Sequence, residues 1–305
     1  MQIFRHFPAV ADAPAALAIG NFDGVHLGHQ AILKRLVEAA QEAGLVAGLL
    51  TFEPHPREVF TPQHAPARLT SLREKLELFE AAGVERVHVC HFDAGFAAMD
   101  ADTFMARVLR DALDVRRLLV GEDFRFGAGR GGAVDDLRRA GIAVESLPDM
   151  KVDKARVSST AIRQALAAGD LPGAARLLGR DYSMSGHVVH GDKLGRALGY
   201  PTANVEMHHD RPPLTGIYAV KLRLSQKGDL PGVASLGVRP TVKADGKPTL
   251  EVHLFDFDGE LYGQHVQVHF LKKIREEAKF ADLEALKRQM ALDEQAARDY
   301  FKNQK

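Results

Sequence analysis

Two histidines at the start of a predicted helix are the first residues whose type and spacing could do chemistry. His26 and His29 lie three positions apart, so on a helix both rings face one side and can reach one ligand. A helix N-terminus adds unpaired N–H groups and partial positive charge, which favour phosphate, and Gly24 and Gly28 let a phosphate chain approach the backbone. This predicts a nucleotide-phosphate site. The alternatives are two exposed histidines in a glycine-rich turn, or a two-histidine zinc site that lacks a nearby cysteine ligand.

A second basic element, Arg156 to Arg163, has two arginines flanking three hydroxyl side chains. Serine and threonine are also good helix N-caps, so a capped helix with a basic first turn is the alternative interpretation. Two arginines suit a polyphosphate better than a structural cap requires. The G-x-G-x-x-G match at Gly127–Gly132 has no clean acidic residue about 20 positions later, and we interpret it as a flexible glycine loop.

A glycine-rich segment in the second half, 186–191, has the spacing of a P-loop. Asp192 stands in place of the required lysine, however, and neither Ser nor Thr follows Lys193, so a P-loop NTPase is excluded. A basic, glycine-rich stretch remains, which continues through Gly195 and Arg196.

Three residues beyond this stretch have side-chain oxygens suited to phosphoryl transfer. Thr202 and Asn204 in P-T-A-N offer the neutral ligands that Mg²⁺ uses beside phosphate oxygens; an ordinary polar turn is the alternative. Glu251 lies on a predicted strand, on the face opposite to the aliphatic Leu250 and Val252. A glutamate there can act as general base toward a hydroxyl, or it can be a solvent-facing residue of a half-exposed strand.

The elements that must position these residues differ between the two halves of the chain. The first half alternates apolar runs with segments of helical spacing, which predicts a parallel sheet with helices on both faces. Ligands are expected beyond the carboxyl ends of the strands, where His26 and His29 follow the first predicted strand. The predicted strands are 15–19, 46–52, 84–89, 117–120 and 142–147, and the predicted helices are 30–43, one between Ser71 and Gly83, 103–113 and 134–140.

The pattern changes near Arg180. After a helical stretch at 159–178, period-two alternation predicts a small antiparallel barrel or sandwich, and the stretch 281–301 is again helical. We place the boundary at Tyr182, which gives domains 1–182 and 183–305. The predicted strands of the second half are 217–224, 233–238, 250–257 and 266–270.

Composition limits the number of domains, the classes of partner and the cellular location that can be expected. A chain of 305 residues exceeds the usual single core, so two domains are expected. Basic and acidic residues balance at 40 each, so no net field attracts nucleic acid or an anionic membrane. The single cysteine, Cys90, excludes an internal disulfide and predicts a buried, inert thiol. With no apparent secretory signal or membrane-spanning run, a cytoplasmic location is expected.

Four motifs of the first half together resemble the FMN adenylyltransferase half of bacterial bifunctional FAD synthetases. They are G-N-F-D-G-V-H-L-G-H-Q at 20–30, T-F-E-P-H-P at 51–56, V-G-E-D-F-R-F-G at 120–127 and R-V-S-S-T-A-I-R at 156–163. The resemblance implies a Rossmann-like nucleotidylyltransferase domain in which the two histidines handle the ATP phosphates. Asp123 stands where one version of the family has Asn, and we assign it to the flavin side. The residues assigned to ATP binding beside the histidines are Asn21, Phe22, Gly24, Gly28, Arg156, Ser159, Thr160 and Arg163.

The second half resembles riboflavin kinase. The motifs are G-H-V-V-H-G-D-K-L-G-R-A-L-G-Y-P-T-A-N at 186–204, G-I-Y-A-V at 216–220, A-S-L-G-V-R-P-T at 234–241 and L-E-V-H-L-F-D-F-D-G-E-L-Y-G at 250–263. The resemblance implies a six-stranded Greek-key barrel with a C-terminal helix. It implies that Thr202 and Asn204 bind Mg-ATP, that Glu251 deprotonates the ribityl hydroxyl, and that Arg275 lies in a mobile segment on the flavin side. Gly191, Lys193, Gly195 and Arg196 complete the assigned ATP site.

The sequence therefore predicts a bifunctional α/β enzyme: a parallel-sheet domain followed by a small antiparallel barrel. The expected reactions are phosphorylation of riboflavin to FMN and adenylylation of FMN to FAD, with ATP as co-substrate and Mg²⁺ as the metal. A homo-oligomer is left open. One alternative is a monofunctional enzyme with one decayed half, which the nearly intact motifs disfavour. Another is a flavin-binding regulator, which would need neither Mg²⁺ ligands nor the base Glu251.

Overall fold

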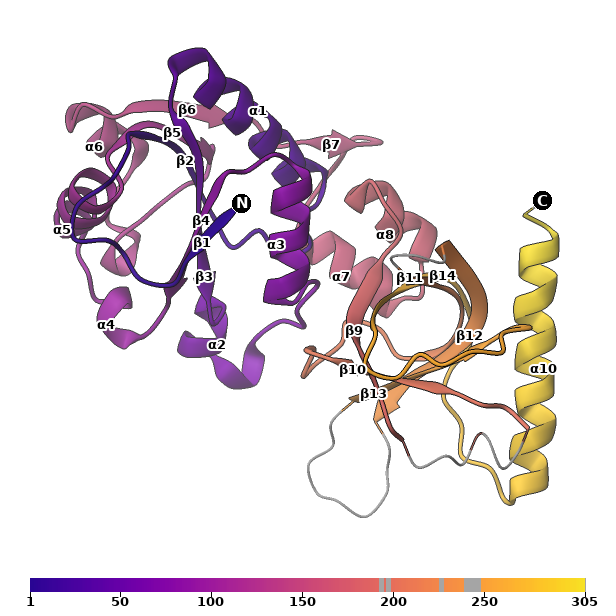
Figure 1. The fold of residues 1–305 in the computed structure, drawn as a ribbon. Helices are drawn as coiled ribbons and strands as arrows, with labels where there is room; N and C mark the ends of the chain where they lie inside the picture. The colour runs from indigo at the N-terminus through magenta and orange to yellow at the C-terminus, as the bar shows by residue number, and fades with distance from the viewer. Residues whose placement is uncertain (192–194, 196–198, 225–227, 239–247, 305) are drawn as a thin grey trace. The chain divides into compact units, whose positions relative to one another are not determined.

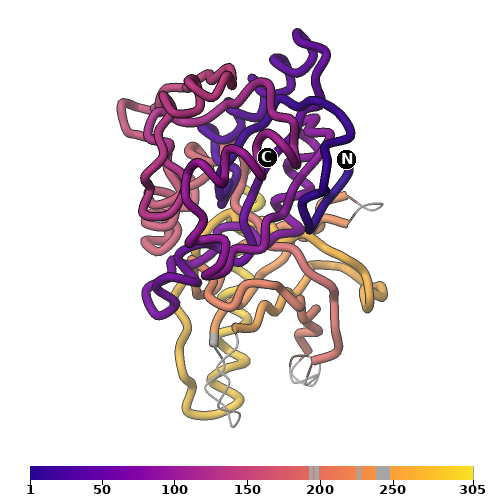
Figure 2. Tube along the Cα trace, turned by 90° about the vertical axis from the view of Figure 1, so that its left-hand side faces the viewer, coloured from indigo at the N-terminus to yellow at the C-terminus, as the bar shows by residue number. Residues whose placement is uncertain are grey.

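The computed structural model describes residues 1–191, 195, 199–224, 228–238 and 248–304. Contacts between residues divide the chain into two compact units. The first contains Met1–Pro66 and Leu72–Ser158, and the second contains Ala67–Ser71 and Ser159–Lys305. The path of the chain through each unit can be followed by colour in Figures 1 and 2.

The first unit is built on a six-stranded sheet in the order β1-β4-β3-β2-β5-β6, and all its pairs are parallel. The expected parallel sheet is thus confirmed. The exposed edge strand β1 was not predicted, so the strand that precedes His26 is the second along the chain. The strands are β1 (Gln2–Phe4), β2 (Ala15–Ile19), β3 (Val46–Glu53), β4 (Arg86–His91), β5 (Val115–Gly121) and β6 (Ala143–Leu147).

Strand β2 lies where the winding of the sheet changes direction. The chain runs outward from β2 through β3 and β4 on one side, and it continues with β5 and β6 on the other side. In open α/β sheets, ligands bind beyond the carboxyl ends of the strands at such a switch point. The segment after β2, which carries His26 and His29, therefore starts at the place where this fold favours ligand binding.

Helices cover both faces of this sheet, as Figure 1 shows. Helices α1 (Leu27–Ala43) and α3 (Leu72–Ala81) pack on one face, where their cluster includes Ala16 and Ala18 of β2. The π-helix η2 (Phe104–Ala112) and α6 (Val134–Arg139) pack on the other face with Leu17 and Ile19. Because alternate residues of β2 enter different cores, the whole strand is apolar.

Cys90 lies in the second of these cores as a free, buried thiol. Burial raises the pKa of its thiol to about 12, with a smaller contribution from Asp93. Since the thiolate is the reactive form, the expectation of a buried thiol is confirmed and the group is unreactive at neutral pH.

Short elements complete the first unit. The glycine run after β5 folds tightly, because a Cβ on Gly127 would lie 2.8 Å from Cα of Ala101. Asp153 and Lys154 have positive φ angles of 50° and 68°, which is typical of a two-residue hairpin turn. The short elements are α2 (Pro56–Phe60), η1 (Pro62–His64), α4 (Ala94–Ala97), α5 (Ala101–Thr103), η3 (Ala128–Arg130), and the hairpin strands β7 (Lys151–Val152) and β8 (Ala155–Arg156).

The second unit contains a closed antiparallel barrel for which the structure describes six strands, in the order β10-β13-β12-β11-β14-β9. Three consecutive strands, β11 to β13, form a meander, and β14 returns beside β11, which is a Greek key. The expected barrel is confirmed. Its strands are β9 (Ser183–Val189), β10 (Ala203–Met207), β11 (Gly216–Leu224), β12 (Gly228–Val238), β13 (Pro248–Leu254) and β14 (His265–Arg275).

Helices α7 (Ser159–Ala167) and α8 (Leu171–Leu178) share a hydrophobic core with this barrel. Ile162 and Leu178 pack in one cluster with barrel residues such as Val220 and Phe270. For this reason the compact units divide at Ser158/Ser159, upstream of the boundary expected at Tyr182. A buried leucine, Leu69, joins the same cluster from the short segment 67–71.

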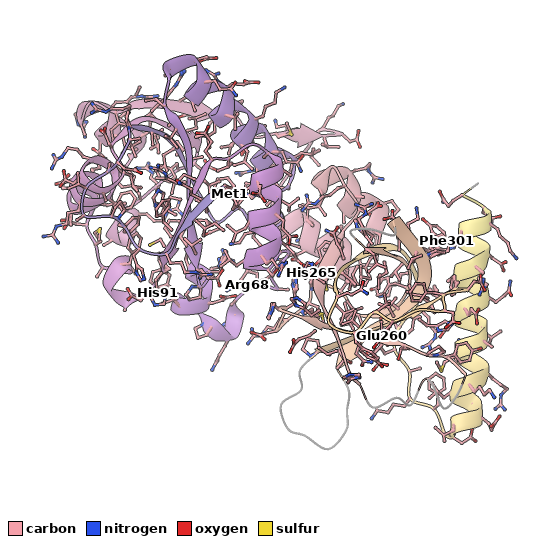
Figure 3. The ribbon with its side chains drawn as sticks, viewed as in Figure 1. Met1, Arg68, His91, Glu260, His265 and Phe301 are labelled. Atoms are coloured by element: carbon pink, nitrogen blue, oxygen red, sulfur yellow. The ribbon has the colours of Figure 1, made fainter. Side chains whose placement is uncertain are left out.

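The C-terminal helix α10 (Leu283–Lys302) covers part of the outer surface of the barrel. Ala297 packs against Phe255 and Ala219, and Phe301, which Figure 3 labels, joins this small cluster. Arg298 stacks 4.4 Å from the ring centroid of Phe255 and pairs with Asp256. Across the part of the chain that is described, no helix is both long and apolar enough to cross a membrane.

Candidate functional site

The loop that follows β2 has an unusual backbone. Phe22, Gly24 and Val25 have positive φ angles of 50°, 83° and 40°. Glycine tolerates this region, but for an aromatic and a β-branched residue it is strained. The loop is closed by a hydrogen bond from the Val25 N–H to the Phe22 carbonyl, and the Gln30 side chain donates to the Val25 carbonyl at 2.8 Å. Such strain concentrates at functional sites, and here it directs the chain into the N-terminus of α1.

The two histidines lie together at this N-terminus. His26 is the N-cap of α1, and its Nδ1 accepts a hydrogen bond from the His29 backbone N–H at 3.3 Å. The imidazole rings stack with centroids 3.6 Å apart and planes 14° from parallel. A Cβ on Gly28 would lie 3.3 Å from the His26 ring, so glycine keeps this packing relaxed. The geometry thus places both rings beside the positive end of the helix dipole.

His29 is held in its neutral form. Burial lowers the pKa of its imidazole well below the usual value, and the nearby positive charges of His26 and Lys75 lower it further. Nδ1 of His29 and Oδ1 of Asn21 are buried and, among the described residues, have no hydrogen-bond partner. Buried polar atoms without partners are rare in proteins. These two atoms are therefore candidates for contacts with a ligand.

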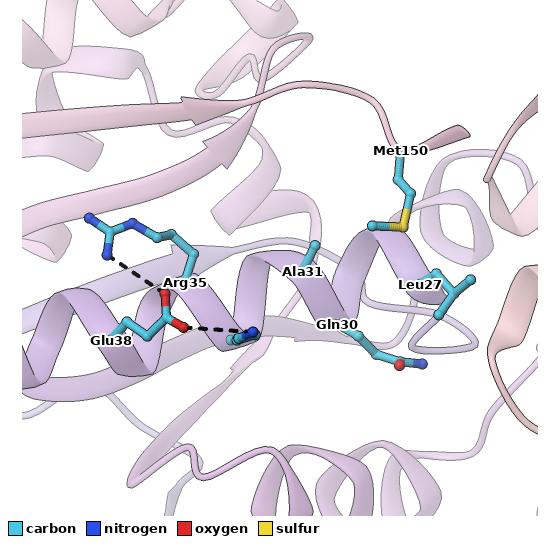
Figure 4. Close-up of a pocket in the computed structure, with 7 residues that line it drawn as sticks. Leu27, Gln30, Ala31, Arg35, Glu38 and Met150 are labelled. Atoms are coloured by element: carbon cyan, nitrogen blue, oxygen red, sulfur yellow. Dashed lines mark ion pairs between the residues drawn. The ribbon is translucent and has the colours of Figure 1, made fainter. Parts of the chain in front are cut away.

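Arg156 and Asp123, which sequence analysis placed at the same site, pair with each other. The Arg156 guanidinium lies 3.1 Å from Asp123 Oδ2 and 2.9 Å from Asp149 Oδ2. The β7–β8 hairpin that carries Arg156 stands next to α1, because a Cβ on Gly28 would lie 3.8 Å from Cβ of Met150. Figure 4 shows Met150 above Leu27, at a pocket of about 490 Å³ along α1.

The other predicted phosphate ligands belong to the second unit. Ser159 and Thr160 form the first turn of α7, and the Arg163 side chain donates to the Ala67 carbonyl at 2.6 Å. Their expected contact with the ATP phosphates therefore stays a prediction.

A row of phenylalanines follows the carboxyl ends of β3, β4 and β5, and sequence analysis missed it. Neighbouring rings in the row have centroids between 5.6 and 6.1 Å apart, and Phe60 at one end is 63% exposed. Phe104 and Phe126 are buried in the core, whereas the other rings are at least partly exposed, and an exposed aromatic surface suits a planar apolar ligand. The rings are spread over more than seventy positions, so only the fold reveals them. The row comprises Phe52, Phe60, Phe92, Phe96, Phe104, Phe124 and Phe126.

In the barrel, strand pairing brings Glu251 beside Asn204. On β13, the partly exposed Glu251 alternates with the buried Leu250 and Val252, as predicted. Glu251 is the register partner of Asn204 on β10 and of Ser235 on β12. Residues directly opposite each other in a sheet project on the same face, so a carboxylate, an amide and a hydroxyl form one row on the outside of the barrel.

The glycine-rich segment lies against this row. A Cβ on Gly191 would lie 2.5 Å from Cγ and Oδ1 of Asn204, and one on Gly195 would lie 3.3 Å from Oγ1 of Thr202. Nδ1 of His253 lies 2.9 Å from the Pro201 carbonyl oxygen, which ties the segment before Thr202 to β13. Lys193 and Arg196, also predicted for ATP binding, lie outside the described residues.

Arg275 ends β14 and is held by α10. Its guanidinium donates to both carboxylate oxygens of Asp293, at 2.8 and 2.6 Å, and Gln289 donates to the same carboxylate. A flavin contact by Arg275 stays a prediction. Within the described ranges, no group of three or more His, Cys, Asp or Glu side chains could hold a metal ion.

Comparison with known proteins gives a match for each half of the chain. The family model for FAD synthetase matches residues 9–161, and the model for riboflavin kinase matches residues 178–301. A bifunctional riboflavin kinase/FMN adenylyltransferase of Pseudomonas fluorescens is 50% identical over 92% of this chain and 91% of its own length. The chain belongs to the bifunctional riboflavin kinase/FMN adenylyltransferase family. The Escherichia coli K12 member is 46% identical over 99% of this chain and 98% of its own length.

The family resemblance inferred from the motifs, and the order of the two halves, are thus confirmed. The overall fold also recurs in a solved structure. A protein of Streptococcus pneumoniae described as a macrolide-efflux protein has a TM-score of 0.83 at 30% identity, and the match covers 98% of this chain and 99% of that one.

Proposed function

We propose that this member of the family makes FAD in two ATP-dependent steps, one in each unit. Riboflavin is first phosphorylated to FMN on the barrel, and FMN is then adenylylated at the parallel sheet. The observation that supports this most strongly is that each unit carries its own group of polar side chains of a kind suited to phosphates. One is the stacked His26–His29 pair at a helix N-terminus, and the other is the Asn204–Glu251 row.

In the kinase step, Glu251 takes the proton of the terminal ribityl hydroxyl, whose oxygen attacks the γ-phosphorus of ATP as ADP leaves. The register that sets Glu251 beside Asn204 supports this role. The Thr202 hydroxyl and the Asn204 amide oxygen would hold Mg²⁺, because this ion prefers hard oxygen ligands and keeps several phosphate and water ligands. When bound, the ion would neutralise charge on the β- and γ-phosphates. Because Gly191 has no Cβ, there is room beside it for the side-chain amide of Asn204.

In the adenylyl step, a phosphate oxygen of FMN attacks the α-phosphorus of ATP, and pyrophosphate leaves. No covalent protein intermediate is needed, so alignment and charge stabilisation supply the catalysis. The N–H groups at the start of α1 and the neutral His29 donate to the phosphates. Arg156 would exchange its carboxylate partners Asp123 and Asp149 for phosphate oxygens. The phenylalanine row offers a surface for the flavin ring, and Ser159, Thr160 and Arg163 remain the proposed triphosphate ligands.

A cytoplasmic location and the lack of a nucleic-acid partner belong to the same proposal. The balanced charge and the single free thiol of Cys90 support both.

One experiment tests both steps in the same protein. Wild type with riboflavin, ATP and Mg²⁺ should give FMN and then FAD, separated by chromatography. Glu251→Gln keeps the side-chain volume and should lower FMN formation about 10²- to 10⁴-fold, while FAD formation from added FMN is unchanged. His29→Ala should do the reverse, with adenylylation reduced by about 10²-fold. Kinase activity of Glu251→Gln within a few-fold of wild type would remove Glu251 as the base, and riboflavin bound without turnover would indicate a regulator.

A further inference from the structure

A buried lysine stands behind the strained loop after β2. Lys75 on α3 is 5% exposed, and its ammonium Nζ lies 3.4 Å from the Asn21 carbonyl oxygen and 4.0 Å from Oε2 of Glu53. The same Asn21 oxygen accepts a hydrogen bond from the hydroxyl of Thr51 at 3.4 Å. Two side chains, those of Lys75 and Thr51, thus hold the Asn21 carbonyl at the start of the loop.

We propose that Lys75 is a positioning residue for adenylyl transfer: it fixes the Asn21 carbonyl and so holds the loop that aligns His26, His29 and the N-terminus of α1. The inference rests on the proposed adenylyltransferase function of this unit. None of the four motifs of the first half includes this lysine.

A second contact from the same helix supports this role. Phe79 lies four residues after Lys75 on α3, so both side chains face the loop. The Phe79 ring meets that of Phe22 edge to face with centroids 5.6 Å apart, and the Phe22 ring lies 5.1 Å from that of His29. Helix α3 therefore supports the loop at two consecutive residues, through a charge at Asn21 and through an aromatic ring at Phe22.

A purely structural role does not explain the charge. Burying an ammonium is costly in free energy even when it is paired, and apolar replacements of buried ion pairs are often neutral or stabilising. An apolar side chain would fill the same space at less cost. The positive charge of Lys75 is explained if it serves the loop, because the ammonium contacts the segment that must receive phosphates.

The charge of Lys75 also acts on His29. Two charged groups act on the imidazole: His26 at the start of α1 and Lys75 on α3. Asp23 of the same loop is buried, and Glu53 at the end of β3 lies 4.0 Å from the Lys75 ammonium. Burial is the main cause that lowers the pKa of His29, and the charges of His26 and Lys75 add to it. Lys75 therefore helps keep the imidazole neutral at the pH where the enzyme works.

The test compares Lys75→Met, Lys75→Arg and a matched control in the full-length protein. The control is Lys34→Met, because Lys34 is 78% exposed on α1 and lies 4.0 Å from Glu38, its ion-pair partner among the described residues. The rate of FAD formation from FMN and ATP measures the effect of each substitution on adenylylation. The rate of FMN formation by the same preparation shows whether the other unit is intact. Lys75→Met should lower kcat for adenylylation by about 10²-fold with little change in KM. Lys75→Arg should recover most of it, and Lys34→Met should behave as wild type.

The pH profile separates positioning from mere stability. Without the Lys75 charge the pKa of His29 rises, so the acid side of the adenylylation profile should move to higher pH in Lys75→Met but not in Lys75→Arg. If Lys75→Met does not fold, the His29 imidazole resonances of Lys75→Arg, titrated by NMR, should still show a pKa well below the usual value.

Three results would overturn the inference. They are adenylylation by Lys75→Met within three-fold of wild type, a loss that arginine does not restore, and an ordinary His29 pKa in Lys75→Arg. A wild-type protein that makes no FAD would instead refute the proposed function itself.

Discussion

Replacing Gly191 by alanine tests whether the position of the Asn204 side chain controls the kinase step. An alanine Cβ would lie 2.5 Å from Cγ and Oδ1 of Asn204, whereas carbon atoms in ordinary contact are about 3.5 Å apart. The amide must therefore move by about 1 Å. Because a displacement of about 1 Å can cost about 10²-fold in rate, we expect kcat/KM for FMN formation to fall by about 10²-fold, or about 2.7 kcal/mol of transition-state stabilisation.

The assay follows FMN by chromatography for Gly191→Ala, Asn204→Ala and the double variant. If alanine at 191 acts through Asn204, the double variant should be no slower than Asn204→Ala alone, since the two changes remove the same interaction. FAD formation from added FMN should be unaffected in all three. Kinase activity of Gly191→Ala within three-fold of wild type, or additive losses in the double variant, would refute the reasoning.

Two further predictions concern stability. Asp293→Ala removes the buried carboxylate that accepts two hydrogen bonds from the Arg275 guanidinium. The guanidinium keeps its hydrogen bond to the Glu276 carbonyl, so we expect the free energy of unfolding to fall by about 2 kcal/mol. Calorimetry of the barrel transition measures this, and an unchanged midpoint would contradict it. His88 is stacked on Phe4, and burial first, then Arg86, lowers the pKa of its imidazole to about 4. As the pH falls below about 6.5, His88 takes up a proton in the unfolded chain but not yet in the folded protein. The free energy of unfolding should therefore be about 2 kcal/mol lower near pH 5 than at neutral pH. In His88→Phe this part of the acid sensitivity should disappear from urea unfolding measured at neutral and acid pH, and an unchanged pH dependence would count against the explanation.

Much of the fold was predictable because its signals are local. The central strands of the first unit are apolar on both faces, so their position could be predicted to within one or two residues at 15–19 and 46–52. Strand β1 has three residues and two of them are exposed, which leaves no apolar pattern to recognise. Strands β9 and β10 were also not located from alternation. Both contain polar residues and β10 has five positions, so their place in the barrel came only from the resemblance to riboflavin kinase.

The site was predictable only as far as its residues are close in sequence. The spacing of His26 and His29 indicated one shared face, and the structure brings their rings together. The capping role of His26 depends on the backbone of the loop. The contact of Lys75 with Asn21 joins residues that are far apart along the chain. Likewise, the pairing of Asn204 with Glu251 depends on strand register, which is a long-range property.

The short segment Ala67–Ser71 limits how the molecule can be divided. It lies in the sequence between β3 and α3 of the first unit, yet its contacts belong to the second, where Leu69 joins the core of α7, α8 and the barrel. The second unit is therefore discontinuous in sequence. Cleavage of any single peptide bond leaves at least one half incomplete, and a fragment that starts at Ser183 loses the core residues Ile162 and Leu178 as well. Exchange of one half for another, in evolution or by engineering, would have to carry this five-residue segment with the barrel or replace the apolar contact it provides.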